Sequence, residues 1–152
     1  MLKFCSLYSG SSGNSLFIQS ENTKILVDCG HSAKKIEAGL SSIGVDITDV
    51  DAILVTHEHT DHIQSIGTIS KKHDIPVFAN FETWEAMPNQ KDKISTENIK
   101  MFENDSEFHI GNLQIMPFST PHDAANPCGF SICNGTKKIS IATDLGHIDE
   151  NI

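Results

Sequence analysis

The sequence predicts an α/β fold in which a mixed β-sheet is flanked by helices. Short apolar runs alternate with helical patterns over the first 80 residues, whereas from Asn98 onward one strand pattern follows another. The length of 152 residues fits one domain with a buried core, and no repeat or low-complexity tract divides the chain. These features predict a single domain, residues 1–152.

The predicted strands are short apolar or alternating segments bounded by turn-forming residues. They comprise residues 2–8, 16–18, 24–27, 52–55, 77–79, 99–102, 113–118, 129–133 and 139–142. The first two predict a β-hairpin, and the run Ser9 to Asn14 between them is an unusual Gly/Ser-rich loop. The strand at 24–27 ends abruptly at Asp28.

Two helices are predicted between the strands. Ser32 can cap the first, and Gly44 stands where a glycine commonly follows a helix. Thr60 is expected to cap the second, which ends before Pro76. The apolar positions at helical spacing are Ile36, Leu40 and Ile43 in the first helix and Ile63, Ile66 and Ile69 in the second.

The composition, 38% hydrophobic and 20% charged, is typical of a globular chain and argues against global disorder. We find no apolar run long enough for a signal segment or a membrane span, so we expect a cytoplasmic protein without a membrane partner. The four cysteines show no metal-binding or redox spacing. We expect Cys5, Cys29, Cys128 and Cys133 to be reduced and mostly buried.

The formal net charge is -9, and all 11 basic residues are lysines. This balance argues against a broad basic surface for nucleic acid. Because arginine is absent, no planar guanidinium can grip a phosphate in two places. Any bound anion must therefore be held by metal ions, lysines or backbone N–H groups.

The segment from His57 to His62 places three imidazoles and the Asp61 carboxylate directly after a predicted strand. Residues two apart on an extended backbone point the same way, so His57 and His59 can converge on one ion. Asp61 and His62 lie where the chain turns into the helix, which suits a second ion. Imidazole ligands suit Zn, Mn or Fe. The motif predicts two divalent metal ions; its alternative is a solvated polar loop.

A catalytic metal site usually needs three protein ligands, so further ligands are expected from later strands. His122 follows the strand that ends at Phe118, and Asp144 follows the strand that ends at Ala142. We expect His122 to be a ligand and the Asp144 carboxylate to bridge both ions. His147 lies too close to Asp144 for the same role, and we expect it on the surface or hydrogen-bonded to a ligand.

Together these residues resemble the metallo-β-lactamase superfamily, whose motifs are a strand-end Asp, HxHxDH, a later His, a bridging Asp and a final His. The resemblance implies an αββα sandwich. It implies that Asp28 orients a ligand histidine from outside the ligand set, and that Asp61 orients or deprotonates the attacking water. The implied ligands are His57, His59 and His122 for the first ion, Asp61 and His62 for the second, and Asp144 between them.

The loop from Ser9 to Ser15 further resembles the WalJ/YycJ-like branch of this superfamily. The branch implies a 5′-to-3′ DNA exonuclease acting through a metal-bound hydroxide on DNA or RNA. The backbone N–H groups of Ser11, Ser12, Gly13 and Asn14 could bind a phosphate of that substrate, with a plain tight turn as the alternative. The net charge of -9 opposes nucleic-acid binding at long range, so local ions or lysines must offset it.

The superfamily's final histidine belongs to a second half, whereas this chain stops eight residues after Asp144. We therefore expect a partial domain, residues 1–152, without its C-terminal half and with an apolar sheet face left open. A complementing chain or a second copy could cover that face. Two other functions stay open: a small-molecule thioester hydrolase resembling glyoxalase II, and a non-catalytic metal-binding half-domain that needs a partner chain.

Overall fold

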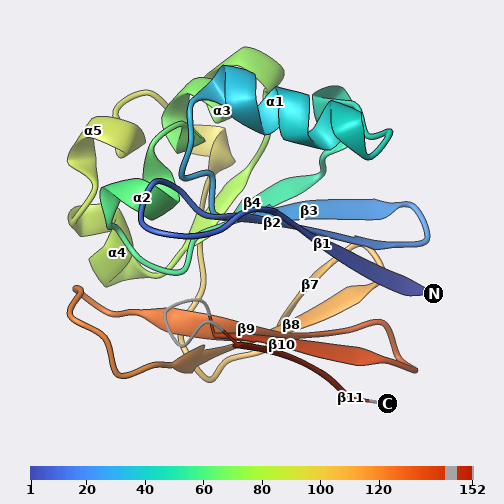
Figure 1. Cartoon of the computed structure of the whole chain (residues 1–152). Coiled ribbons are helices and arrows are strands. Elements are labelled where there is room, and N and C mark those ends of the chain that lie inside the picture. Colours follow the sequence, from blue (N-terminus) through green and yellow to red (C-terminus); the bar gives the residue numbers. More distant parts are fainter. Residues whose placement is uncertain (143–146, 152) are drawn as a thin grey trace.

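The computed structural model describes residues 1–142 and 147–151, and arranges them in three layers. Helices cover one face of a first β-sheet, and a second β-sheet covers its other face (Figure 1). The first sheet contains β1 (Leu2–Tyr8), β2 (Ser15–Ser20), β3 (Thr23–Val27), β4 (Ala52–Leu54), β5 (Val77–Ala79) and β6 (Ile99–Met101). The second contains β7 (Phe108–Ile110), β8 (Leu113–Ser119), β9 (Cys128–Cys133), β10 (Lys138–Ala142) and β11 (His147–Asn151).

The first sheet is mixed, as predicted, with the strand order β1-β2-β3-β4-β5-β6. The hairpin β1–β2 and the pair β2–β3 are antiparallel. The strands β3 to β6 are parallel to one another, because helical segments return the chain between them. The second sheet is antiparallel, in the order β11-β10-β9-β8-β7. Since parallel strands end at one edge, the residues after β3 and β4 lie together.

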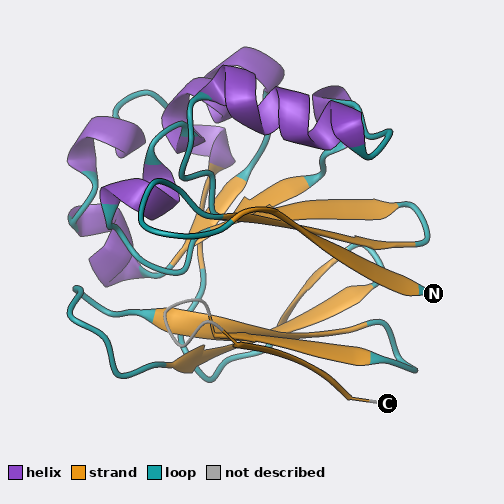
Figure 2. Cartoon of the chain, in the orientation of Figure 1, coloured by secondary structure: helices purple, strands orange, loops and turns teal. Residues whose placement is uncertain are grey.

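The helices lie on the outer face of the first sheet and between its later strands (Figure 2). They are α1 (Ala33–Ser42), α2 (Thr60–Ile63), α3 (Ile66–His73), α4 (Phe81–Glu85) and α5 (Pro88–Lys91), with short 3₁₀ helices η1 (Ile47–Asp49) and η2 (Thr96–Asn98). The first helix begins as predicted, because the Ser32 hydroxyl accepts from the Lys35 N–H at 3.2 Å. Gly44 follows it with a φ of 78°.

The second predicted helix differs from the expectation in two ways. Its cap position is His59, whose backbone is extended, and Thr60 is already helical, so Thr60 does not cap it. The helix is also divided into α2 and α3 by Gln64 and Ser65. The break has a physical cause: the backbone N–H of Ser65 donates to the carbonyl of Cys29 at 3.0 Å, which ties the segment to the end of β3.

Two apolar layers follow from the alternation of side chains along each strand. In β3, Leu26 faces the helices and packs with Ile36 and Trp84, whereas Ile25 and Val27 face the second sheet. Ile63, Ile66 and Ile69 are buried under the helices, as expected, while Ile43 is 40% exposed at the end of α1. The layer between the sheets contains Ile18, Leu54, Phe102, Leu113, Ile115, Phe130, Ile132, Ile139 and Ile141.

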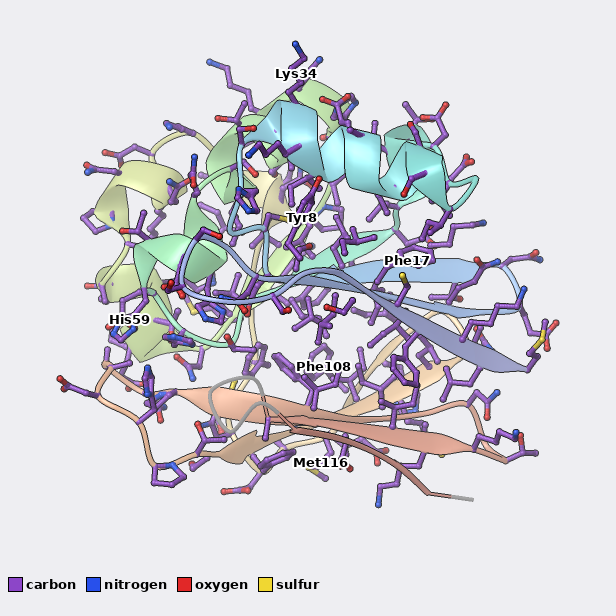
Figure 3. The ribbon with its side chains drawn as sticks, viewed as in Figure 1. Tyr8, Phe17, Lys34, His59, Phe108 and Met116 are labelled. Carbon is purple, nitrogen blue, oxygen red and sulfur yellow. The ribbon has the colours of Figure 1, made fainter. Side chains whose placement is uncertain are left out.

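The expectation that the first sheet would leave an apolar face open is wrong. The strands after residue 107 form a second sheet, and their inward side chains cover that face. The sequence contained the reason, since apolar residues alternate along β8, β9 and β10. The outward face of this second sheet carries half-buried side chains such as Met116, Ser131 and Ser140, and Met116 points away from the core in Figure 3.

The four cysteines are free thiols; Cys29 and Cys128 are buried, whereas Cys5 and Cys133 are only partly buried. Within the described residues, no helix combines the length and the apolar character that crossing a membrane requires.

The layer between the sheets should dominate stability. Phe130 is fully buried there and contacts the Phe102 ring edge to face, at a centroid distance of 5.5 Å. We expect Phe130→Ala to lower the free energy of unfolding by about 3–5 kcal/mol, because it removes buried apolar area and leaves a cavity. Phe81→Ala is the matched control, since Phe81 is 54% exposed and should change it by less than about 0.5 kcal/mol. Urea unfolding followed by circular dichroism measures both; equal effects would contradict this packing.

Candidate metal centre

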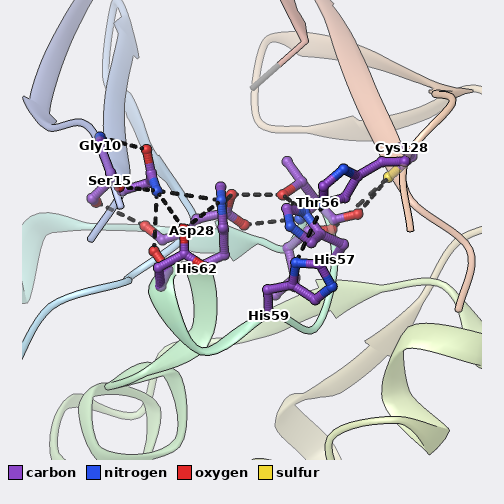
Figure 4. Close-up of polar contacts among 12 residues, drawn as sticks. Gly10, Ser15, Asp28, Thr56, His57, His59, His62 and Cys128 are labelled. Atoms are coloured by element: carbon purple, nitrogen blue, oxygen red, sulfur yellow. Dashed lines mark hydrogen bonds and ion pairs between the residues drawn. The ribbon is translucent and has the colours of Figure 1, made fainter. Parts of the chain in front are cut away.

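The predicted site residues lie at the edge of the first sheet where β3 and β4 end. Asp28 follows β3, and Thr56 and His57 follow β4. His122 approaches from the segment after β8, on the second sheet. Figure 4 shows Asp28, Thr56, His57 and His62 linked by polar contacts. The site therefore depends on both sheets.

Three histidines converge as the sequence suggested. One ligand atom from each of His57, His59 and His122 lies within 4.8 Å of the others. The Nδ1 atom of His59 and the Nε2 atom of His122 are 3.3 Å apart. Zn–N bonds of about 2.0–2.1 Å place tetrahedral nitrogen ligands about 3.3–3.4 Å apart, which is the separation of the His59 and His122 atoms. The cluster of three is thus close enough that it could hold a metal ion.

The Asp28 carboxylate connects the strand ends to the histidines. It is fully buried and accepts from the Thr56 N–H at 2.8 Å, from the Thr56 hydroxyl at 2.7 Å and from His62 Nδ1 at 2.7 Å. Its own backbone has a φ of 65°, a conformation that Asp tolerates better than most residues. Three donors compensate the cost of burying this charge.

These contacts assign the tautomers of two histidines. Because the Asp28 carboxylate accepts, His62 carries its proton on Nδ1 and presents the lone pair of Nε2. The Thr56 hydroxyl donates to Asp28, so its oxygen accepts from His57 Nδ1 at 2.9 Å. His57 then also presents the lone pair of Nε2 toward the site. A metal ligand must offer such a lone pair.

Asp61 and His62 lie beside the three histidines. The ring centroids of His57 and His62 are 4.1 Å apart, and Asp61 Oδ2 lies 3.5 Å from His62 Nε2. His62 is 2% exposed, whereas the Asp61 side chain is 34% exposed and can reach solvent or substrate. The pair thus presents one nitrogen and one carboxylate next to the first cluster.

Asn14 contacts this pair with its side chain, which the sequence analysis did not anticipate. Its Nδ2 lies 3.1 Å from Asp61 Oδ2 and 3.3 Å from His62 Nε2, and its Oδ1 accepts from the Gly10 N–H. The opposite amide orientation would place oxygen against carboxylate and carbonyl oxygens, so the contacts fix the assignment. The backbone of Asn14 donates to the Asp61 carbonyl at 2.8 Å.

The Gly/Ser loop offers fewer free amides than we expected. The N–H groups of Gly13 and Asn14 donate to the carbonyls of Gly10 and Asp61, whereas Ser11 and Ser12 are exposed. A Cβ on Gly30 would collide with the carbonyl of Asp61. Only glycine therefore allows the loop, the end of β3 and Asp61 to pack this closely.

Asp144, the expected bridging ligand, lies outside the described residues. The backbone of His147 begins β11 and pairs with Ala142 of β10. The two buried cysteines near Asp28 are poor ligands, because burial and the neighbouring carboxylate raise the pKa of the Cys29 and Cys128 thiols far above their ordinary value. The donors of the site are therefore imidazoles and carboxylates.

Sequence reasoning also missed Thr56 and Glu58. Thr56 links Asp28 to His57, and Glu58 accepts from the Ala125 N–H, with its two carboxylate oxygens 3.3 and 3.0 Å from that nitrogen. A signal was available for Thr56, since a hydroxyl directly before His57 can reach the Nδ1 atom of that ring. Nothing in the local sequence pairs Glu58 with Ala125.

The sequence is similar to those of known proteins of one superfamily. The profile of the metallo-beta-lactamase superfamily matches residues 8–152. The chain is 38% identical to the exodeoxyribonuclease YycJ of Bacillus anthracis over 151 residues, which are 99% of this chain and 57% of that protein. It is 37% identical to the exodeoxyribonuclease WalJ of Streptococcus pneumoniae over 152 residues, 99% of this chain and 56% of that protein.

A solved structure shows the same fold. The metallo-beta-lactamase fold protein YhfI of Bacillus subtilis matches with a TM-score of 0.70 and 23% identity, over 92% of this chain and 61% of that chain. The chain belongs to the metallo-β-lactamase superfamily, as the motifs indicated. It spans somewhat more than half the length of the two exodeoxyribonucleases that it matches.

Asp28 should control metal affinity through the tautomer of His62. In Asp28→Asn the amide N–H₂ would donate where the carboxylate accepts, which would move the His62 proton to Nε2. We expect divalent metal affinity to fall about 10–100-fold in titration calorimetry with Mn²⁺ or Zn²⁺. Asp49→Asn, an exposed site on η1, is the matched control and should bind as the unmodified chain does. Unchanged affinity in Asp28→Asn would contradict this role.

Proposed function

We propose that this chain belongs to a dinuclear metal-dependent hydrolase that cleaves phosphodiester bonds of DNA from the 5′ end. The observation that carries the proposal is that His122 comes from a distant segment to lie beside His57 and His59. The 37–38% identity to two proteins named exodeoxyribonucleases supports the substrate class. RNA offers the same phosphodiester chemistry and is the nearest alternative substrate.

In this proposal, His57, His59 and His122 hold the first ion, and Asp61 and His62 hold the second. Asp144 would supply a carboxylate to both. The donor set of imidazoles and carboxylates suits Zn or Mn, and also Fe. When bound, such ions lower the pKa of water toward about 7 and withdraw charge from a phosphoryl oxygen.

The residues of this chain have separate tasks in the reaction. Asp61 is partly exposed beside the cluster, so its carboxylate can orient the attacking water and accept a proton from it. The water oxygen forms a bond to phosphorus, the bond from phosphorus to the leaving sugar oxygen breaks, and that oxygen takes up a proton from solvent. Asp28 and Thr56 keep the rings of His62 and His57 in the tautomers that face the site.

Substrate contacts follow from the charge of the chain. With a net charge of -9 and no arginine, the chain must bind phosphate locally instead of through a broad basic surface. The exposed Ser11 and Ser12 amides next to Asn14 and Asp61 are the proposed phosphate donors. Two divalent ions would add about four positive charges at the same place.

We also propose that residues 1–152 are a partial domain. The chain spans 57% and 56% of the lengths of the two exodeoxyribonucleases, which supports this reading. Further sequence, a complementing chain or a second copy would then contact the outward face of the second sheet, around Met116, Ser131 and Ser140.

His59→Ala tests the function directly. We expect release of nucleotides from 5′-phosphorylated duplex DNA, with Mn²⁺ or Zn²⁺, to fall at least about 100-fold, because a ligand of the first ion is lost. EDTA should abolish the release in the unmodified protein. His109→Ala is the matched control, since that side chain is 56% exposed on β7. Parallel assays contain RNA and a small thioester. Turnover of the thioester alone would contradict a nuclease, and metal binding without any turnover would favour a non-catalytic half-domain.

A further inference from the structure

The segment that carries His122 has no regular secondary structure. It runs from Thr120 to Pro127, between β8 and β9. A segment of this kind is ordinarily more mobile than the strands it connects. Nevertheless, His122 Nε2 lies 3.3 Å from His59 Nδ1, and a metal site tolerates little displacement of a ligand. Some contact must therefore hold this segment in place.

Glu58 provides such a contact. It lies between His57 and His59 in sequence, and its two carboxylate oxygens lie 3.0 and 3.3 Å from the Ala125 nitrogen, whose N–H they accept. Where His57 and His59 converge on one side of the chain, the residue between them is directed elsewhere. The carboxylate of Glu58 thus connects the segment bearing two of the histidines to the segment bearing the third.

A second set of contacts holds the next residue, Asn126. Its carbonyl accepts from Asn80 Nδ2 at 2.8 Å, and its Oδ1 accepts from Asn104 Nδ2 at 3.2 Å. Its own Nδ2 donates to Glu82 Oε1 at 2.9 Å. Asn80 is 2% exposed and caps α4, so this anchor is part of the first layer. The segment is thus fixed at two consecutive residues, both within four positions of His122.

The backbone closes the segment at its ends. The Thr120 N–H donates to the Pro127 carbonyl at 3.1 Å, and the Cys128 N–H donates to the Thr56 carbonyl at 3.0 Å. Within the segment, the Ala125 N–H donates to Glu58 of the HxHxDH motif. Unlike the contacts of Asn126, this hydrogen bond joins the segment directly to the residue between His57 and His59, so Glu58 has the more direct effect on the position of His122.

We infer that Glu58 is a positioning residue for His122: its carboxylate holds the Ala125 amide, and thereby sets the distance of His122 from His57 and His59. The inference rests on the proposed first metal site. It goes beyond that site, because Glu58 is not a ligand and acts on the metal only through the 120–127 segment. An acceptor oxygen at this position is what the role requires, and its charge is secondary.

The experiment compares Glu58→Ala with Glu58→Gln, which keeps an acceptor oxygen. Zn²⁺ affinity is measured by competition with a chromophoric chelator, and amide exchange of Ala125 is measured in the metal-free chain. We expect Glu58→Ala to weaken binding of the first ion about 10–100-fold and to speed exchange at Ala125. Glu58→Gln should restore affinity to within about threefold of the unmodified chain. Glu97→Ala, a carboxylate removed from the exposed η2, is the matched control and should change neither quantity.

Asn126→Ala tests the second anchor independently, since it removes the side-chain contacts and keeps the carbonyl. It should weaken binding of the first ion, as Glu58→Ala does. Urea unfolding verifies that each variant is folded. Unchanged affinity and exchange in Glu58→Ala would overturn the inference, as would a Glu58→Gln variant as weak as Glu58→Ala. If the unmodified chain bound no ion, the proposed function would fail, while exchange at Ala125 would still decide whether Glu58 holds the segment.

Discussion

The buried carboxylate of Asp28 is the group on which the rest of the site depends. A fully buried charge costs several kcal/mol unless donors surround it, and here the Thr56 backbone, the Thr56 hydroxyl and His62 Nδ1 all donate to it. The acceptor Asp28 follows β3, whereas the Thr56 donors follow its parallel neighbour β4 and His62 lies in α2. The same contacts that make the charge tolerable therefore join the two strand ends and fix two imidazole rings. The hydrogen bonds around Asp28 therefore both stabilise the buried charge and orient the rings of His57 and His62.

Much of this arrangement is encoded locally and could be predicted from the sequence. Alternation of apolar residues located most of the strands, and the abrupt change to polar residues after Val27 and Val55 located the site. The side-chain contacts were less predictable. The pairing of Glu58 with Ala125 spans 67 positions, and nothing near either residue indicates it. The division between α2 and α3 likewise depends on the carbonyl of Cys29, which is distant in sequence.

The error about the open sheet face has a different cause. The strand patterns at 113–118, 129–133 and 139–142 were recognised, but they were not assigned to a second sheet. Periodicity shows that a strand has an apolar face and does not show which sheet it joins. Residues such as Phe130 and Ile141 are buried against the first sheet because they form a second layer. Family resemblance to a sandwich of two sheets was the better guide here.

The two halves of the site differ in how firmly the fold holds them. His57, Thr56 and Asp28 follow strands and are buried, so the first sheet fixes them. Asp61 is held by its neighbours: Asn14 donates to its carbonyl and to its carboxylate, and Gly30 packs against its backbone. The Gly/Ser loop is thereby coupled to Asp61, because displacing Asn14 removes contacts from both. If Ser11 and Ser12 bind a phosphate and Asp61 activates the water, as proposed, a bound phosphate would change the position of the Asp61 carboxylate through Asn14. Substrate binding and proton transfer would then be linked.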